Sequence, residues 1–297
     1  MNLAICGANS SVGRNLIEHL LAEVDTTAVA MVRSQRAADG LPVFERIQPV
    51  VVDYQDEADL ARHLAGVDAV VHLAGVLFEA RGSSYARANV ATTAAVAAAA
   101  KAAGARQLIF ISALGAASDS SNAYLRSKGE AEDVVRACGL PATILRTPML
   151  IGPGSAAAYS LMRSASRPQA WLLGGGRQVL RPLDLDDLSG AILVAAQQPP
   201  GGVTTLELTG PQAITQEALI RLIASMHGRP VRVRSIPVWL GKAFAAVLHA
   251  LKGGGLSPGV IEVITAEERV TDNGDAALGI TLTPLEATLA KLIGNDS

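Results

Sequence analysis

Residues 3–13, Leu-Ala-Ile-Cys-Gly-Ala-Asn-Ser-Ser-Val-Gly, decide the fold of this chain. A short apolar run leads directly into a loop with a glycine at each end, and an amphipathic segment follows the loop. Glycine lets backbone N–H groups come close to a pyrophosphate, and the start of a helix attracts an anion. The stretch therefore predicts a strand, a dinucleotide-binding turn and a helix, with a plain tight turn as the alternative. The residues expected to contact the cofactor here are Gly7, Asn9, Ser10, Ser11, Val12 and Gly13.

Ser10 stands where the usual Gly-x-x-Gly-x-x-Gly spacing has its middle glycine. A serine side chain is small enough to keep the loop, and its hydroxyl could donate a hydrogen bond to phosphate. We therefore expect the loop to bind a dinucleotide despite this substitution.

Outward from the loop, short apolar runs alternate with longer amphipathic runs through the first half of the chain. Such alternation is typical of a parallel sheet covered by crossover helices. We expect an α/β fold with a Rossmann-type, doubly wound parallel sheet rather than a barrel, and the pattern leaves the strand order open. The expected strands are 2–6, 27–32, 47–52, 69–73, 107–112 and 142–146, and the helices between them include 85–103 and 124–137.

The pattern changes after the sixth expected strand, where irregular and glycine-rich stretches replace the strand-helix units. We expect residues 1–150 to form an NAD(P)-binding Rossmann domain that is completed by a helical segment within 182–198. Residues 151–181 and 199–297 are expected to form a smaller C-terminal α/β lobe that contacts substrate or a partner, with a linker at 197–202.

Three signals predict helix starts in the smaller lobe. Thr215 is expected to cap one helix, and Ser257 followed by proline starts another. Thr283, Pro284 and Glu286 have the spacing of a capping box with proline at the first helical position.

The composition excludes several classes of protein. The chain has 297 residues, of which 49% are hydrophobic and 18% charged, so we expect a folded protein with a sizeable core rather than a disordered one. The formal net charge is −2, and the few Phe, Trp and Tyr residues cannot build the stacking platforms of single-stranded nucleic-acid binders. Nucleic acid is therefore not an expected partner.

The remaining composition predicts where the protein works. Cys6 and Cys138 fit a reducing compartment, and neither the cysteines nor the five histidines have metal-ligand spacing, so no metal site is expected. The longest uncharged stretch near the middle, 88–100, is shorter than the ~18 apolar residues of a membrane span. Because Met1 leads straight into a strand-like run without a signal peptide, we expect a cytoplasmic protein with no transmembrane segment.

The end of the second strand usually selects between the two nicotinamide dinucleotides. An acidic side chain there holds the ribose 2′-hydroxyl of NAD, whereas arginine accommodates the 2′-phosphate of NADP. This chain has Arg33 and Arg36 and no carboxylate at that point, which favours NADP, with NAD still possible and a solvated strand end as the alternative. Asp53, after the third strand, could accept a hydrogen bond from the adenine amino group or cap a loop.

Several segments together resemble the short-chain dehydrogenase/reductase superfamily, in its extended and atypical, NAD-dependent epimerase/dehydratase-like branches. Within it, the chain is most similar to the bacterial relatives of the NAD(P)H-binding accessory subunit of respiratory complex I. Besides the glycine loop, the matching segments include His72-Leu-Ala-Gly75, Ile111-Ser-Ala-Leu-Gly-Ala116, Tyr124-Leu-Arg-Ser-Lys128, Leu145-Arg-Thr-Pro148 and Pro182-Leu-Asp-Leu-Asp-Asp187.

The resemblance implies two further groups of cofactor contacts and also shows two departures from the family pattern. The implied contacts are Leu73, Ala74 and Gly75 along the ribose and pyrophosphate, and Thr147, Pro148 and Met149 near the nicotinamide. Asp184 stands where many members have histidine, and Ala113 replaces the serine that binds the substrate oxygen. Because alanine cannot donate a hydrogen bond, the usual Ser-Tyr-Lys set is incomplete unless another hydroxyl substitutes, and the candidates are Ser112, Ser120 and Ser121.

Tyr124 and Lys128 lie four residues apart on an expected helix and so share one face of it. A nearby ammonium and the positive charge of the nicotinamide would favour the tyrosine phenolate, so that Tyr124 could exchange a proton with a carbonyl or alcohol during hydride transfer. Lys128 would also bind the ribose hydroxyls. An ordinary amphipathic helix face is the alternative. His72, at the end of an apolar strand, is expected to be a packed side chain rather than a base.

Two functions remain open from the sequence. The first is NADP(H)-dependent hydride transfer on a carbonyl, an alcohol or a nucleotide-sugar-like substrate, with Tyr124 as acid-base beside Lys128 and Ser112. The second is a non-catalytic NADP(H)-binding protein with a structural, assembly or redox-sensing role, which is motivated by Ala113 and by the amphipathic segment 239–252. That segment could meet a membrane surface or a partner protein, or it could pack within the smaller lobe. A homodimer is also considered, as relatives commonly pair through Rossmann helices.

Overall fold

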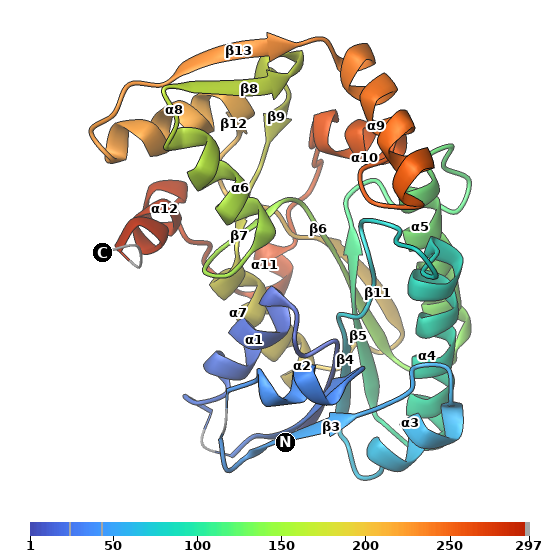
Figure 1. The fold of residues 1–297 in the computed structure, drawn as a ribbon. Helices are drawn as coiled ribbons and strands as arrows, with labels where there is room; N and C mark the ends of the chain where they lie inside the picture. The colour runs from blue at the N-terminus through green and yellow to red at the C-terminus, as the bar shows by residue number, and fades with distance from the viewer. Residues whose placement is uncertain (24, 43, 295–297) are drawn as a thin grey trace.

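The computed structural model describes residues 1–23, 25–42 and 44–294, and its centre is a parallel sheet of seven strands (Figure 1). The strand order is β11-β6-β5-β4-β1-β2-β3, which winds outward in both directions from β1. This order is that of a doubly wound Rossmann sheet and confirms the predicted fold class. The strands are β1 (Asn2–Cys6), β2 (Thr27–Val32), β3 (Ile47–Val51), β4 (Ala69–His72), β5 (Gln107–Ala113), β6 (Ala142–Thr147) and β11 (Val203–Glu207).

Helices cover both faces of the sheet. One layer contains α1 (Ser11–His19), α2 (Gln35–Asp39) and α7 (Leu185–Gln197), and the other contains α3 (Glu57–His63), α4 (Thr92–Ala102) and α5 (Ala123–Ala137). Because alternate strand residues point to opposite faces, Leu3 and Ile5 pack in the first layer, whereas Ala4 and Cys6 pack in the second. Burial on both faces explains why the strands are apolar almost throughout.

The predicted helix over 85–103 has a break in its helical type. Residues Ala86–Ala91 form a π-helical segment, η1, and the α-helix proper begins at Thr92. Asn89 is buried in η1, where its carboxamide accepts from the Val76 N–H at 2.7 Å and donates to the Val76 carbonyl at 3.2 Å. Turns of this kind are rare and often lie at functional sites, and here Asn89 ties the π-helical segment to the backbone of Val76.

Most of the remaining elements form a smaller group in the upper half of Figure 1. The short helix Asp275–Leu278 instead packs against α7 near the centre of the picture, where Leu278 joins the Rossmann core. The core of the smaller group joins Leu161, Leu219, Ile223 and Leu289 with Ile151. The strands pair as β10-β7, β12-β9 and β13-β8. The remaining elements are β7 (Leu150–Ile151), α6 (Ala156–Ala165), β8 (Gln169–Leu173), η2 (Gly174–Gly176), β9 (Val179–Leu180), β10 (Leu183–Asp184), β12 (Ile214–Thr215), α8 (Gln216–Met226), β13 (Arg232–Ile236), α9 (Val238–Lys252), α10 (Pro258–Thr265), α11 (Asp275–Leu278) and α12 (Leu285–Gly294).

Strand β11 differs from the expectation that residues 199–297 lie in the smaller lobe. It pairs in parallel with β6, from Val203 opposite Ala142 to Glu207 opposite Arg146, and forms the edge of the large sheet. The linker before β11 is therefore a connection within the Rossmann sheet. The stretch is only partly apolar because an edge strand is covered less completely than a central one.

All three predicted helices are present, and the caps predicted for two of them are confirmed. Thr215 caps α8 by accepting from the Ala218 N–H, and Ser257 caps α10 by accepting from the Val260 N–H. The capping box at Thr283 is wrong, because its N–H and hydroxyl both donate to the Asp187 carboxylate, at 2.8 and 2.7 Å. A carboxylate on a distant helix thus outcompetes the local cap. None of the helices within 1–23, 25–42 and 44–294 has the length and apolarity needed to cross a membrane.

Candidate functional site

The glycine loop between β1 and α1 is closed tightly against its neighbours. Gly7 has φ +82°, and a Cβ atom there would lie 3.0 Å from the backbone nitrogen of Ala74. A Cβ atom at Gly13 would lie 2.5 Å from the carbonyl oxygen of Ala8. Both positions therefore require glycine, the first because of its backbone conformation and the second because α1 starts directly against the loop. This cradle fits a pyrophosphate, because a loop packed so closely against the start of α1 can present backbone N–H groups to an anion.

Ser10 caps α1 in the position of the missing middle glycine. Its hydroxyl accepts from the Gly13 N–H at 3.0 Å. Beside it, the Gly7 N–H donates to the Tyr54 hydroxyl at 2.7 Å, and that hydroxyl donates to the Met31 carbonyl at 3.0 Å. Tyr54 is thus a buried side chain whose hydroxyl links the glycine loop to the end of β2 through two hydrogen bonds. Sequence reasoning missed it, because nothing in its spacing distinguishes it from a core aromatic.

A cavity opens over the carboxyl ends of β1 and β4. It brings together seven of the predicted cofactor residues with four that were not predicted. The predicted lining residues are Gly7, Asn9, Ser10, Arg33, Leu73, Ala74 and Gly75, and the others are Tyr54, Val76, Ala88 and Thr92. Ser11, Val12 and Gly13 lie in the first turn of α1, next to this cavity but not on its wall.

A second cavity continues from the first, and Arg33 and Tyr54 line both. Arg87, on η1, also lines it and was not singled out in the sequence, since it lies far along the chain from the second strand. Asp53 lines this cavity as well. Its Oδ1 accepts from the Gln55 N–H at 2.9 Å, so the same side chain also stabilises the loop after β3. Arg36 lies on α2 and lines neither cavity.

Tyr124 lies in the first turn of α5. Asn122 caps this helix by accepting from the N–H groups of Tyr124 and Leu125. The Tyr124 ring lies 5.8 Å from the ring of Tyr85, which precedes η1. Burial raises the pKa of Tyr124 to about 12, and Tyr85 adds to the increase. The hydroxyl therefore keeps its proton at neutral pH.

Lys128 follows one turn later and is buried. Its Nζ donates to the Ile111 carbonyl at 2.7 Å and lies 4.2 Å from the centre of the Phe110 ring. Burial lowers the pKa of Lys128 to about 8, while the Glu132 carboxylate acts in the opposite direction. The ammonium is thus held beneath the end of β5.

Ser112 is engaged in a buried charge network. Its hydroxyl donates to Oε1 of Glu132 at 2.7 Å, and Arg146 binds both oxygens of the same carboxylate. Burial opposes the charge on Glu132, but the hydrogen bonds from Arg146, Ser112 and Arg136 outweigh it and keep the pKa of Glu132 below its ordinary value. Ser112 therefore anchors β5 to α5. Of the other candidate hydroxyls, Ser120 accepts from the Asn122 N–H.

The residues after β6 are held by a carboxylate from far along the chain. The Met149 N–H donates to Oε1 of Glu268 at 3.1 Å, and Glu268 also accepts from the Arg181 N–H. Burial raises the pKa of Glu268 against these hydrogen bonds. Thr147, at the end of β6, donates to the Ser112 carbonyl at 3.3 Å. Glu268 was not singled out in the sequence, because its partners are backbone groups.

His72 is a packed side chain, as predicted. It is fully buried, stacks on Phe110 with ring centres 5.5 Å apart, and contacts the Thr93 hydroxyl at 3.0 Å. Burial lowers the pKa of His72 to about 3, so that the ring is neutral. Within the described ranges, His, Cys, Asp and Glu side chains form no group that could hold a metal ion.

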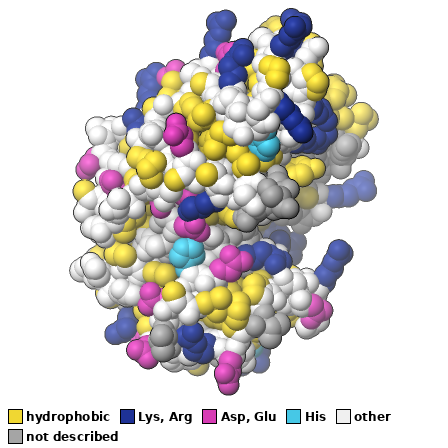
Figure 2. Space-filling model, turned by 90° about the vertical axis from the view of Figure 1, so that its left-hand side faces the viewer, with side chains coloured by type: hydrophobic (Ala, Val, Ile, Leu, Met, Phe, Trp, Pro, Cys, Tyr) yellow, Lys and Arg dark blue, Asp and Glu magenta, His cyan; other side chains and the backbone are white. Residues whose placement is uncertain are grey.

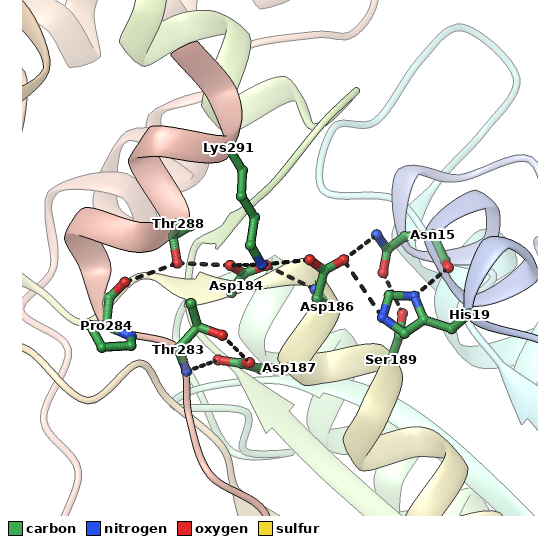
Figure 3. A network of polar contacts seen from close by, with 10 residues as sticks. All are labelled: Asn15, His19, Asp184, Asp186, Asp187, Ser189, Thr283, Pro284, Thr288 and Lys291. Atoms are coloured by element: carbon green, nitrogen blue, oxygen red, sulfur yellow. Dashed lines mark hydrogen bonds and ion pairs between the residues drawn. The ribbon is translucent and has the colours of Figure 1, made fainter. Parts of the chain in front are cut away.

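A polar network joins the glycine-loop helix to the C-terminal helix (Figure 3). Asp184 caps α7, and the Lys291 ammonium of α12 lies between the carboxylates of Asp184 and Asp186. Asn15 of α1 donates to Asp186 at 2.8 Å and accepts from the Ser189 hydroxyl at 2.6 Å. The aspartate in the family's histidine position is therefore a structural residue, and the network sets α1 relative to α7 and α12.

Comparison with known proteins agrees with this architecture. A family model described as NAD(P)H-binding matches residues 7–170. The ceramide reductase of Caulobacter vibrioides is 27% identical over 79% of this chain and 73% of that protein. The mitochondrial NADH dehydrogenase [ubiquinone] 1 alpha subcomplex subunit 9 of Arabidopsis thaliana is 27% identical over 82% of this chain, which spans 62% of the subunit.

Among solved structures, MoeE5 in complex with UDP-glucuronic acid and NAD superposes with a TM-score of 0.77, at 19% identity and with all of both chains covered. At that identity the likeness shows the fold alone, and the fold is the one predicted from the glycine loop and the strand pattern. The chain belongs to the NAD(P)H-binding family, with the fold of the epimerase/dehydratase-like short-chain dehydrogenases/reductases.

Proposed function

We propose that this protein is an NADP(H)-dependent reductase that converts a ketone or aldehyde into an alcohol, with Tyr124 as the proton donor. The observation that carries the proposal is the position of Tyr124 at the start of α5, one turn before Lys128 and with its ring 5.8 Å from that of Tyr85, which leads into the η1 segment beside the cofactor cavity. A tyrosine with a raised pKa is suited to act as an acid, because it keeps its proton until an oxyanion develops beside it.

The cradle fits the cofactor because Gly7 and Gly13 leave room only for backbone beside the helix start. When bound, the reduced nicotinamide would supply a hydride to the carbonyl carbon. Tyr124 would give its hydroxyl proton to the carbonyl oxygen and become a phenolate that is reprotonated from solvent. Lys128 would stabilise that phenolate and bind ribose hydroxyls after releasing its hydrogen bond to Ile111. Gly75 and Ala74 would present backbone to the ribose and pyrophosphate.

The choice of NADP rests on Arg33, which lines both cavities, and on Arg87, which lines the second. Two guanidinium groups at one cavity can hold a 2′-phosphate through paired hydrogen bonds. Asp53 at the same cavity would bind the adenine amino group. Arg36 is exposed outside both cavities and contributes only long-range attraction.

The test is NADPH oxidation with a panel of ketones and aldehydes that includes long-chain and nucleotide-sugar substrates. Tyr124→Phe should reduce kcat by about 10²- to 10⁴-fold, because general acid catalysis by a positioned side chain contributes that much. NADPH should raise the melting temperature of both proteins equally, since the variant keeps the cradle. Undiminished turnover in Tyr124→Phe would refute the assignment of the proton donor.

A second candidate function is cofactor binding without turnover, in a structural, assembly or redox-sensing role. Two observations favour it: Ala113 occupies the usual serine position, and the Ser112 hydroxyl is committed to Glu132. The resemblance to a complex I subunit points the same way. An Ala113→Ser variant separates the two functions, because a dormant reductase should gain turnover from it, whereas a binding protein should not.

We also infer a cytoplasmic location, which the two free cysteines Cys6 and Cys138 support. A homodimer through the Rossmann helices is a further proposal, which the molecular mass in solution would test.

A further inference from the structure

The outward face of α9 is apolar along its whole length. Every exposed side chain that the structure describes on this helix is alanine or a larger apolar residue. The larger ones are Trp239 at 70% exposure, Leu240 at 47%, Phe244 at 62%, Val247 at 58% and Leu251 at 78%. The last four recur at helical spacing and so form a single stripe. The opposite face packs inward, where Gly241 adjoins Leu173 and Ala245 is fully buried.

A further exposed aromatic residue lies at the same end of the molecule. Trp171 of β8 is 62% exposed and is paired in register with Arg234 of β13, while Arg232 lies two residues earlier on the same side. Strand β13 runs directly into α9, along the top of Figure 1. Both tryptophans of the chain are therefore exposed in this region, which we call the α9 surface and define by α9, Trp171, Arg232 and Arg234.

Charge is distributed unevenly between this end and the rest of the chain. Residues 151–181 and 211–265 contain ten Lys and Arg and two Asp and Glu, whereas all other residues contain fifteen and twenty-five. Figure 2, which views the side of the molecule away from α9, shows Lys and Arg side chains gathered at the upper end, with most Asp and Glu lower down. The net charge of −2 conceals a basic end of +8, which attracts an anionic surface.

We propose that the α9 surface docks the protein onto an anionic lipid bilayer. An amphipathic helix with Trp, Phe and Leu on one face inserts that face at the boundary of headgroups and acyl chains, and nearby arginines bind anionic headgroups. Tryptophan favours this interface because its ring is apolar and its N–H can remain hydrated. From the sequence, packing within the smaller lobe is the alternative interpretation of this helix. The exposure of the apolar stripe excludes such packing for the side chains that form it.

Docking would place the bilayer beside the candidate active site. The loop between α9 and α10 contacts the segment before η1, where the Gly255 N–H donates to the Glu79 carbonyl at 2.6 Å. Glu79 also accepts from the N–H of Tyr85, whose ring adjoins Tyr124. Asn122, the cap of α5, donates to the Gly259 carbonyl of α10 at 2.8 Å. A membrane-dissolved substrate would therefore have a short path to Tyr124, although the docking itself does not depend on catalysis.

The experiment is co-sedimentation of the full chain with vesicles of phosphatidylcholine alone and of phosphatidylcholine with about one-third phosphatidylglycerol. We expect binding to the anionic vesicles that weakens with salt. It should fall at least about tenfold in Phe244→Glu/Leu251→Glu, because burying two carboxylates opposes insertion. Leu21→Glu, at an exposed apolar position in the Rossmann part, is the matched control and should bind as the unchanged protein does.

Tryptophan fluorescence provides a second readout, since both tryptophans belong to the α9 surface. Their emission should shift to shorter wavelength on addition of anionic vesicles and should not shift in the double variant, whose melting temperature should match that of the unchanged protein. Absence of binding to anionic vesicles, or equal binding by the double variant, would overturn the proposal. If the unchanged protein binds no vesicles but forms a dimer, and the double variant is a monomer, the α9 surface is instead an interface with a second copy of the chain.

Discussion

At the scale of single residues, the cofactor cradle depends on two glycines, because neither has a Cβ atom. Gly7 and Gly13 leave space for backbone where a Cβ would meet Ala74 or Ala8. Tyr54 then fixes the loop by a hydrogen bond to the Gly7 N–H. The glycines could be predicted from their spacing, but Tyr54 could not, since a hydrogen bond between residues 47 positions apart leaves no local pattern.

The first prediction concerns Gly7. Gly7→Ala should lower the free energy of unfolding by more than about 1–2 kcal/mol, the cost of a left-handed backbone for a residue with Cβ, and should abolish NADPH binding. Gly66→Ala is the matched control, because Gly66 has a similar φ of +74° but open space around it. Urea unfolding of both variants measures the difference. Equal losses would show that the contact with Ala74 adds nothing.

The second prediction concerns pH. The His72 pKa is about 3 in the folded protein and 6.5 when unperturbed, so between these values only the unfolded state binds the proton. Stability therefore falls as pH falls through this window, by about 1.4 kcal/mol per pH unit. His72→Gln should remove this part of the slope, as measured by urea unfolding at several pH values. An unchanged slope would contradict a neutral, buried ring.

At the scale of elements, the strands of the Rossmann part were predictable to within a residue or two, because two-sided burial makes each one a short apolar run. The sequence did not reveal β11, which is an edge strand with polar residues. Nor did it reveal the π-helical turn of η1, which is set by the hydrogen bonds of Asn89, or the true partner of Thr283. These features depend on contacts between distant segments.

The third prediction tests how α12 is attached. Lys291→Met removes the ammonium between Asp184 and Asp186 and leaves the buried Asp184 with fewer partners. We expect a loss of about 1–3 kcal/mol of unfolding free energy, because hydrogen bonds to charged groups contribute that much. Lys242→Met is the control, since its ion pair with Glu262 is partly exposed and should contribute less than about 1 kcal/mol. A similar loss in both variants would contradict the role of the network.

At the scale of the whole molecule, the protein consists of a cofactor-binding sheet and a basic end that carries an exposed apolar helix. The composition alone hides this division, because a net charge of −2 averages an acidic Rossmann part with a basic lobe. The proposed reductase and the proposed membrane docking are joined where the α9–α10 loop meets the segment before η1. The proposed lipid-binding surface would thereby lie close to Tyr85, whose ring adjoins Tyr124.

The most direct test of the proposed cofactor site is calorimetric titration of the protein with NADPH and NADH. The account predicts one site per chain that prefers NADPH, and Arg33→Ser should weaken NADPH by at least about tenfold while changing NADH little, because only NADPH carries the 2′-phosphate. Leu21→Glu should bind both as the unchanged protein does. Absence of binding, or equal affinity for the two dinucleotides in the unchanged protein and in Arg33→Ser, would contradict the account.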